Sequence, residues 1–162
     1  MTVDFDELWH VGVVVGDLES AMDQLARSFG HEWSTVLERE VAVHLVGGEA
    51  GSEQSSRVRW TASRGGPPQW EVIEAESGLW SVEANPGGGL HHLAYWSDDL
   101  AGDSAELQAE GYRLEAWGDD EHGATRFIYL LGPNGLRIEI GAAETRPAWE
   151  EWTSGGDYGI RF

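Results

Sequence analysis

The spacing of apolar residues predicts a strand followed by a helix near the start of the chain. The run "HVGVVV", residues 10–15, is rich in β-branched residues and suits a strand that is buried on both faces. Apolar residues then recur at helical spacing between Asp17, which is placed to cap a helix, and Gly30, which is placed to end it. Turn-forming residues separate three further strands, expected over about 34–46, 56–63 and 69–74.

The second half of the chain repeats this order. When His92 is aligned on His10, Asp99 falls on Asp17, and the match extends as far as Leu107 on Leu25. The repeat predicts a strand at "HHLAYWS", a helix capped by Asp98 or Asp99, and three strands near 112–117, 124–131 and 136–141. Each half is therefore predicted to be one βαβββ unit.

The two units, about residues 8–84 and 90–142, are joined by the linker "EANPGGG". Neither unit is large enough to bury a core alone, so we expect them to form a single domain over residues 1–142. Residues 143–162 form a C-terminal extension outside both units. Its aromatic residues indicate that part of it packs against the domain, whereas a pair of glycines indicates a loose end: Trp149, Trp152, Tyr158 and Phe162 against Gly155 and Gly156.

Four predicted strands each carry a histidine or a glutamate on a face of small or polar residues, and their opposite faces are apolar. Because side chains alternate along a strand, His10 shares its face with Gly12, and Glu139 shares its face with Gly141. This asymmetry predicts an α+β fold in which one mixed sheet curves into a cup, with helices on the outside. Four side chains would then meet inside the cup: His10, Glu71, His92 and Glu139.

Composition narrows the chemistry. The 162 residues carry a net charge of −19. This charge argues against a nucleic-acid partner, because a protein that binds nucleic acid needs a basic surface. The chain has no cysteine, so a bound metal must take nitrogen and oxygen ligands, and it has no lysine for Schiff-base chemistry. No apolar run reaches membrane-spanning length, and the acidic start "MTVDFDEL" differs from a secretory signal, so we expect a cytoplasmic protein without membrane contact.

Two imidazoles and two carboxylates in a concave site are a suitable ligand set for one divalent metal. Taken alone, a histidine at the start of a strand is more often a hydrogen-bonded structural residue, and a strand glutamate usually faces water. The four residues occupy corresponding positions in both units, however, and a pseudo-twofold arrangement would bring corresponding strands together. The sequence therefore predicts a metal site. The neighbouring His91 is expected to face away from it.

Several of these segments resemble one protein family. "HVGVVVGDLESAM", "WEVIEA", "GGGLHHLAYWSDDL" and "LLGPNGLRIEIG" are similar, in order and spacing, to the vicinal oxygen chelate superfamily of glyoxalases, bleomycin-resistance proteins and extradiol dioxygenases. The resemblance covers about residues 8–142 and is strongest to the glyoxalase I and methylmalonyl-CoA epimerase branch. It implies one divalent ion held by His10, Glu71, His92 and Glu139. Zn, Ni, Co, Mn, Fe and Mg are all possible identities for this ion.

The resemblance implies an isomerase, epimerase or lyase that moves a proton next to a metal-chelated carbonyl through an enolate-like intermediate. Glu139 and Glu71 are then the catalytic carboxylates, with Glu40, Glu74, His44 and Tyr129 as further candidates for the general base. An extradiol dioxygenase is less favoured, since Glu71 would fill a coordination position that catechol and oxygen need. The alternative is a non-catalytic protein that binds an antibiotic or metabolite, and the nine tryptophans keep it open.

The expected substrate is a small molecule with a carbonyl group or neighbouring oxygens. Trp96, Tyr129 and Arg137 are predicted to line its site. A coenzyme A thioester is disfavoured by the negative charge, although the cluster of Arg57, Arg59 and Arg64 could contact phosphates; another carbonyl compound remains equally open. Because an open cup leaves sheet edges uncovered, we also expect a homodimer.

Overall fold

The computed structural model describes residues 1–47 and 52–160, and within them it confirms two βαβββ modules. The first module contains β1 (His10–Val14), α1 (Leu18–Phe29), β2 (Leu37–Leu45), β3 (Glu53–Ala62) and β4 (Gln69–Ala75). The short helix η1 (Gly78–Trp80) leads to the second module, made of β5 (Gly89–Ser97), α2 (Leu100–Ala109), β6 (Arg113–Asp119), β7 (Thr125–Leu131) and β8 (Arg137–Ala142). The chain continues through η2 (Ala143–Thr145) and α3 (Arg146–Thr153).

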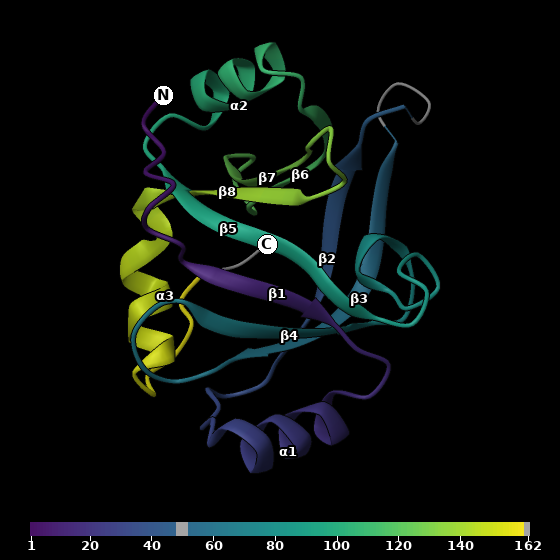
Figure 1. Ribbon diagram of the computed structural model, residues 1–162, viewed down its shortest axis with the longest axis vertical. Helices are drawn as coiled ribbons and strands as arrows, with labels where there is room; N and C mark the ends of the chain where they lie inside the picture. Colours follow the sequence, from purple (N-terminus) through teal and green to yellow (C-terminus); the bar gives the residue numbers. More distant parts are fainter. Residues whose placement is uncertain (48–51, 161–162) are drawn as a thin grey trace.

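The strands form one mixed sheet that closes on itself in the order β1-β4-β3-β2-β6-β7-β8-β5. Within each module the first and last strands run parallel, as β1 with β4 and β5 with β8. The modules join through two antiparallel pairs, β1 with β5 and β2 with β6 (Figure 1). The predicted cup is thus curved into a complete barrel. The homodimer was expected because an open cup would leave strand edges unpaired, and in the closed barrel those edges are paired. The homodimer therefore stays a prediction, but uncovered strand edges no longer support it.

Both long helices begin where the sequence predicts, and α1 also ends there. The Asp17 side chain accepts a hydrogen bond from the Ser20 amide at 2.7 Å, and Gly30 ends α1 with a φ of 73° that favours glycine. Of the two candidates for the second cap, Asp99 accepts from the Gly102 amide at 3.0 Å. α1 and α2 lie on opposite outer sides of the barrel, as Figure 1 shows.

Apolar side chains fill two regions. One lies beneath α2 and includes Leu107, Leu130 and Ile140. The other lies inside the barrel and is rich in aromatic rings, among them Trp60, Trp80, Phe127 and Tyr129. The sequence predicts small or polar residues only on the inner faces of the four strands that carry the histidines and glutamates. The large rings come from other elements: Trp60 from β3, Phe127 and Tyr129 from β7, and Trp80 from η1.

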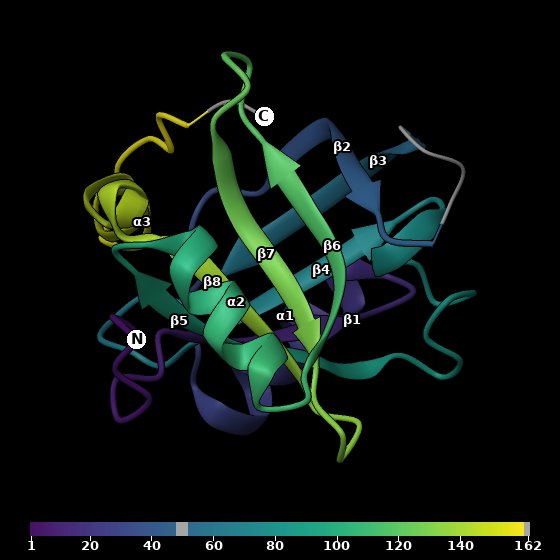
Figure 2. The same cartoon turned by 90° about the horizontal axis from the view of Figure 1, so that it is seen from above.

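The C-terminal extension packs against the barrel, as its aromatic residues predict. Trp149 and Trp152 of α3 are buried, and the Trp152 Nε1 donates a hydrogen bond to the Thr35 carbonyl at 2.9 Å. The Tyr158 ring lies 5.2 Å from the Trp152 ring, whereas Phe162 falls outside the described residues. Figure 2 shows α3 beside the strands at one side of the barrel.

A membrane-spanning segment is not found: none of the helices in the described ranges combines the length and apolar character that crossing a bilayer requires.

Trp152 allows a test of how much the extension stabilises the fold. Its side chain is 0% exposed, so Trp152→Ala removes buried contacts and leaves a cavity, and we expect the free energy of unfolding to fall by about 3–5 kcal/mol. Urea denaturation measures this change. As a control, Phe29→Ala removes a ring that is 67% exposed and should change stability by less than about 0.5 kcal/mol. If Trp152→Ala lowered the free energy of unfolding as little as Phe29→Ala, the packing of α3 would add no stability.

Candidate metal centre

The antiparallel pairing of β1 with β5 brings two histidines together. Gly12 pairs with His92 across these strands, and a side-chain carbon at Gly12 would lie only 2.0 Å from the His92 ring. The missing side chain leaves room for that ring to turn inward. As a result, His10 Nε2 lies 2.8 Å from His92 Nε2, although the two residues come from different modules.

The two parallel strand pairs add the carboxylates. Glu71 of β4 pairs with Gly12 of β1, and its Oε2 lies 3.3 Å from His10 Nε2 and 3.5 Å from His92 Nε2. Glu139 of β8 pairs with Ala94 of β5, and its Oε2 lies 3.1 Å from His92 Nε2 and 3.9 Å from His10 Nε2. All four side chains predicted from the sequence therefore gather at one place.

Three of these residues fit a divalent metal. The donor atoms of His10, Glu71 and His92 all lie within 4.8 Å of one another. Nitrogen and oxygen ligands bind such an ion at about 2.0–2.2 Å, so adjacent ligand atoms stand about 3.0–3.6 Å apart. The observed separations of 2.8, 3.3 and 3.5 Å come close to this range, and the group could hold a divalent ion. Glu139 lies next to the group without belonging to it.

The charges of the site interact strongly because the group is buried. Burial raises the pKa of Glu71, but His10 and His92 outweigh burial and hold it well below its usual range. Burial lowers the pKa of His92, but the carboxylates of Glu139 and Glu71 outweigh it and raise that pKa to about 9. A proton on His92 thus offsets buried negative charge at neutral pH, and a bound cation would replace that proton.

His91 contacts the Nδ1 side of the His92 ring, opposite the Nε2 that faces the metal group. Its Nε2 lies 3.2 Å from the Leu79 carbonyl and must donate to it, so its Nδ1 accepts from His92 Nδ1 at 2.8 Å. Burial lowers the pKa of His91 to about 2, which keeps the ring neutral for this role. With its Nδ1 proton used, His92 can present the Nε2 lone pair to a metal. His91 faces away from the group itself, and sequence reasoning missed this contact.

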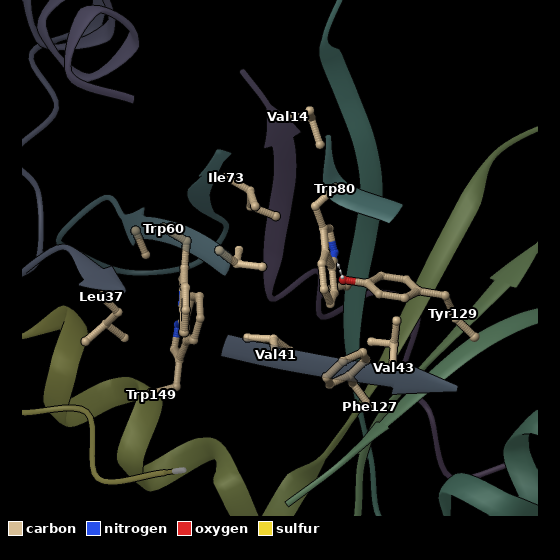
Figure 3. Close-up of a cluster of buried hydrophobic side chains, with 14 of the residues drawn as sticks. Val14, Leu37, Val41, Val43, Trp60, Ile73, Trp80, Phe127, Tyr129 and Trp149 are labelled. Atoms are coloured by element: carbon tan, nitrogen blue, oxygen red, sulfur yellow. Dashed lines mark hydrogen bonds between the residues drawn. The ribbon is translucent and has the colours of Figure 1, made fainter. Parts of the chain in front are cut away.

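A cavity of about 80 Å³ opens beside the group. His10, Glu71 and Glu139 form one wall, while most of the rest is aromatic. Figure 3 shows Trp60 and Trp149 on one side of this space, with Trp80, Phe127 and Tyr129 on the other. Of these five rings only Tyr129 was predicted; the signal for Trp149 was the aromatic content of the extension.

Tyr129, which the sequence predicts to line the substrate site, borders the cavity. Its hydroxyl oxygen accepts a hydrogen bond from Trp80 Nε1 at 3.2 Å. Burial, together with the nearby Glu139 and Glu71 carboxylates, raises the pKa of Tyr129 well above its usual value. The phenol therefore stays protonated at neutral pH, and Tyr129 is unsuited to act as a general base.

The structure places the other two predicted lining residues outside the cavity wall. Trp96 stacks on Trp9 with ring centroids 3.4 Å apart, and Trp9 takes the position at the cavity. Trp9 fits there because Gly141 has no side chain to oppose its ring. Arg137 instead donates to the Glu115 carboxylate at 2.6 Å and to the His91 carbonyl at 3.2 Å.

Three further candidates for the general base have other partners. Glu40 is exposed and accepts a hydrogen bond from Ser55, while His44 lies 3.2 Å from the Asp119 carboxylate. Glu74 accepts from the Leu18 amide at 2.7 Å and pairs with Arg59. The cavity is lined by none of these three, so Glu71 and Glu139 remain the carboxylates placed to act.

The chain is similar to proteins of one known family. The family model described as the Glyoxalase/Bleomycin resistance protein/Dioxygenase superfamily matches residues 9–130. The chain belongs to this superfamily. The resemblance inferred from the motifs is thereby confirmed, together with the fold. No curated protein sequence matches the chain.

Solved structures with the same superfamily fold include methylmalonyl-CoA epimerases. A variant of the Streptomyces coelicolor epimerase, in complex with 2-nitronate-propionyl-CoA, is 20% identical, covers 84% of this chain and 96% of its own, and has a TM-score of 0.56. The Mycobacterium tuberculosis epimerase is 22% identical, with a TM-score of 0.51 and coverage of 84% and 87%. A mutant of 4-hydroxymandelate synthase from Streptomyces coelicolor, at 21% identity and a TM-score of 0.56, covers 83% of this chain and 48% of its own. At these identities the likeness is one of fold.

The pKa of His92 leads to a test of metal binding against pH. Because this pKa is about 9 before metal is bound, a metal ion must displace the His92 proton at neutral pH. Apparent affinity should therefore rise about tenfold for each pH unit from about 6.5 to 9 and level off above that. Chelator-competition titrations of Co²⁺ measure it, and an affinity that does not change across this range would contradict the assignment.

The contact between His91 and His92 can be tested by substitution. His91→Ala should weaken Co²⁺ affinity by about 10–100-fold while leaving the metal ligands in place, because His92 loses the partner that fixes its tautomer. His122→Ala, which changes an exposed histidine, is the matched control and should bind Co²⁺ like the wild type. Equal affinities in both variants would show that His91 does not orient His92.

Proposed function

We propose that this protein is a divalent-metal-dependent isomerase, epimerase or lyase that transfers a proton next to a chelated carbonyl group. One observation carries the proposal: a buried group of two imidazoles and a carboxylate, with a second carboxylate beside it, borders an internal cavity. His10, Glu71 and His92 would hold the ion, with Glu139 as the fourth ligand. A divalent cation there would polarise a bound carbonyl and make the neighbouring C–H more acidic.

The carboxylates then provide for proton transfer. Glu71 and Glu139 both border the cavity, so either can reach a carbon atom of a bound molecule, whereas His92 is 0% exposed and lies behind them. Their partly apolar surroundings exclude bulk water, which protects an enolate-like intermediate from side reactions. The Glu71 pKa is held low by His10 and His92, so Glu71 is a weak proton acceptor. Glu139, which lies beside the metal group and borders the cavity, is the other carboxylate that can accept the proton.

Two other functions of the superfamily are less well supported. A dioxygenase needs open positions for substrate and oxygen, and a fourth ligand at Glu139 or Glu71 would fill one of them. A protein that binds a metabolite without turnover is favoured by one observation, the aromatic wall of the cavity. Catalysis and binding differ in one measurable property, the exchange of a substrate hydrogen with solvent.

Glu71 provides the test. Glu71→Ala should lower Co²⁺ affinity by at least about tenfold and abolish deuterium exchange into hydroxyacetone in D₂O, measured by NMR. Glu71→Gln should retain more of the metal, since an amide oxygen can still coordinate. Glu76→Ala changes an exposed glutamate just beyond β4 and should behave like the wild type.

Each result has a distinct meaning. Unchanged metal content in Glu71→Ala would contradict the assigned ligand set. A wild-type protein that binds Co²⁺ but exchanges no hydrogen would support binding without turnover in place of the proposed reaction.

A further inference from the structure

The space beside the metal group is small. It measures about 80 Å³, and it is bounded on one side by His10, Glu71 and Glu139. An apolar cavity of about 150 Å³ is large enough for one benzene molecule. The cavity is not sealed, so this volume limits the part of a molecule that lies beside the metal group, and that part must be smaller than a benzene ring.

The C-terminal extension sets this limit. Thr145, Trp149 and Tyr158 all line the cavity, and each lies beyond the last strand of the barrel. The Trp149 ring stacks on His10 with centroids 4.9 Å apart and an interplanar angle of 19°. The buried Trp152 anchors the same helix to the first module through the Thr35 carbonyl. The extension thus forms one wall of the cavity, next to a proposed metal ligand.

The chemistry of the walls favours an uncharged molecule. Apart from the metal group, Arg126 is the one charged residue in the described part of the chain that lines the cavity. Its guanidinium is already paired with the carboxylates of Asp120 and Glu144. An anion entering this space would meet aromatic rings, a neutralised arginine and a divalent ion whose two charges Glu71 and Glu139 would balance, so its charge would lose hydration with little gain in attraction.

The surface outside the cavity repels polyanions. An outer hollow shares Arg126 and Thr145 with the cavity, and it also carries the carboxylates of Asp120, Glu121 and Glu144. Two of the three arginines that could have bound phosphates are also paired with carboxylates. Arg57 pairs with Glu38, and Arg59 pairs with Glu19 and Glu74. Both arginines alternate along β3 with Val58 and Trp60, which face the cavity, so they point to the other side of the sheet.

We propose that the C-terminal extension limits the cavity to a small, uncharged carbonyl compound and excludes coenzyme A thioesters. This inference rests on the proposed metal-dependent function and defines its substrate class. Tyr158 is the residue through which the limit can be relaxed, since it lines the cavity from the tail beyond α3 and is only partly buried.

The test uses the full chain loaded with Co²⁺, whose visible spectrum changes when a ligand coordinates. Three probes are titrated: acetohydroxamic acid as a small chelator, benzohydroxamic acid as a bulky one, and propionyl-CoA. In the wild type, acetohydroxamic acid should bind at least about 100-fold more tightly than propionyl-CoA. Tyr158→Ala should bind benzohydroxamic acid at least about tenfold more tightly than the wild type, with acetohydroxamic acid changed by less than about twofold.

Tyr112→Ala is the matched control, because Tyr112 is another partly buried tyrosine that packs in the cluster beneath α2. It should leave all three titrations unchanged. Propionyl-CoA binding as tightly as acetohydroxamic acid would overturn the inference, and so would unchanged benzohydroxamic acid binding in Tyr158→Ala. A wild-type protein that takes up no Co²⁺, measured before any probe is added, would overturn the proposed function, and the inference would fall with it.

Discussion

The close approach of two imidazoles across the β1–β5 pair is the contact on which the site depends. Gly12 makes it possible, since any side chain there would occupy the space of the His92 ring. The same strand pair joins the two modules, so the contact that closes the barrel also assembles the metal group. Glu71 and Glu139 reach it from the parallel strands on either side, at corresponding positions of the two modules.

Burial leaves the negative charge of the two carboxylates poorly solvated, and a bound cation would neutralise it. Two carboxylates face two imidazoles in a largely dehydrated setting, and the raised pKa of His92 shows that the site attracts positive charge. His91 and the Leu79 carbonyl keep the Nδ1 side of His92 occupied and leave its Nε2 toward the carboxylates. By contrast, His10 Nδ1 is buried and has no hydrogen-bond partner among the described residues, so only one histidine is oriented in this way.

Local and repeated features of the fold could be predicted from the sequence. The caps at Asp17 and Asp99 depend on nearby residues, and the duplicated pattern located both modules. Strand alternation with that duplication brought the four histidine and glutamate side chains together. The closure of the barrel, the position of Trp80 and the contact between His91 and His92 depend on packing between segments distant in sequence, which periodicity does not encode. Alternation alone also placed Trp96 at the cavity, where Trp9 lies instead.

We propose that one divalent ion is bound by two imidazoles together with carboxylate oxygens. X-ray absorption spectroscopy of the protein loaded with one equivalent of Zn²⁺ tests it most directly. We expect nitrogen and oxygen scatterers at about 2.0–2.2 Å, with the multiple-scattering pattern of two imidazoles. A spectrum that shows a hydrated ion, or an ion bound by carboxylates without imidazole, would contradict it.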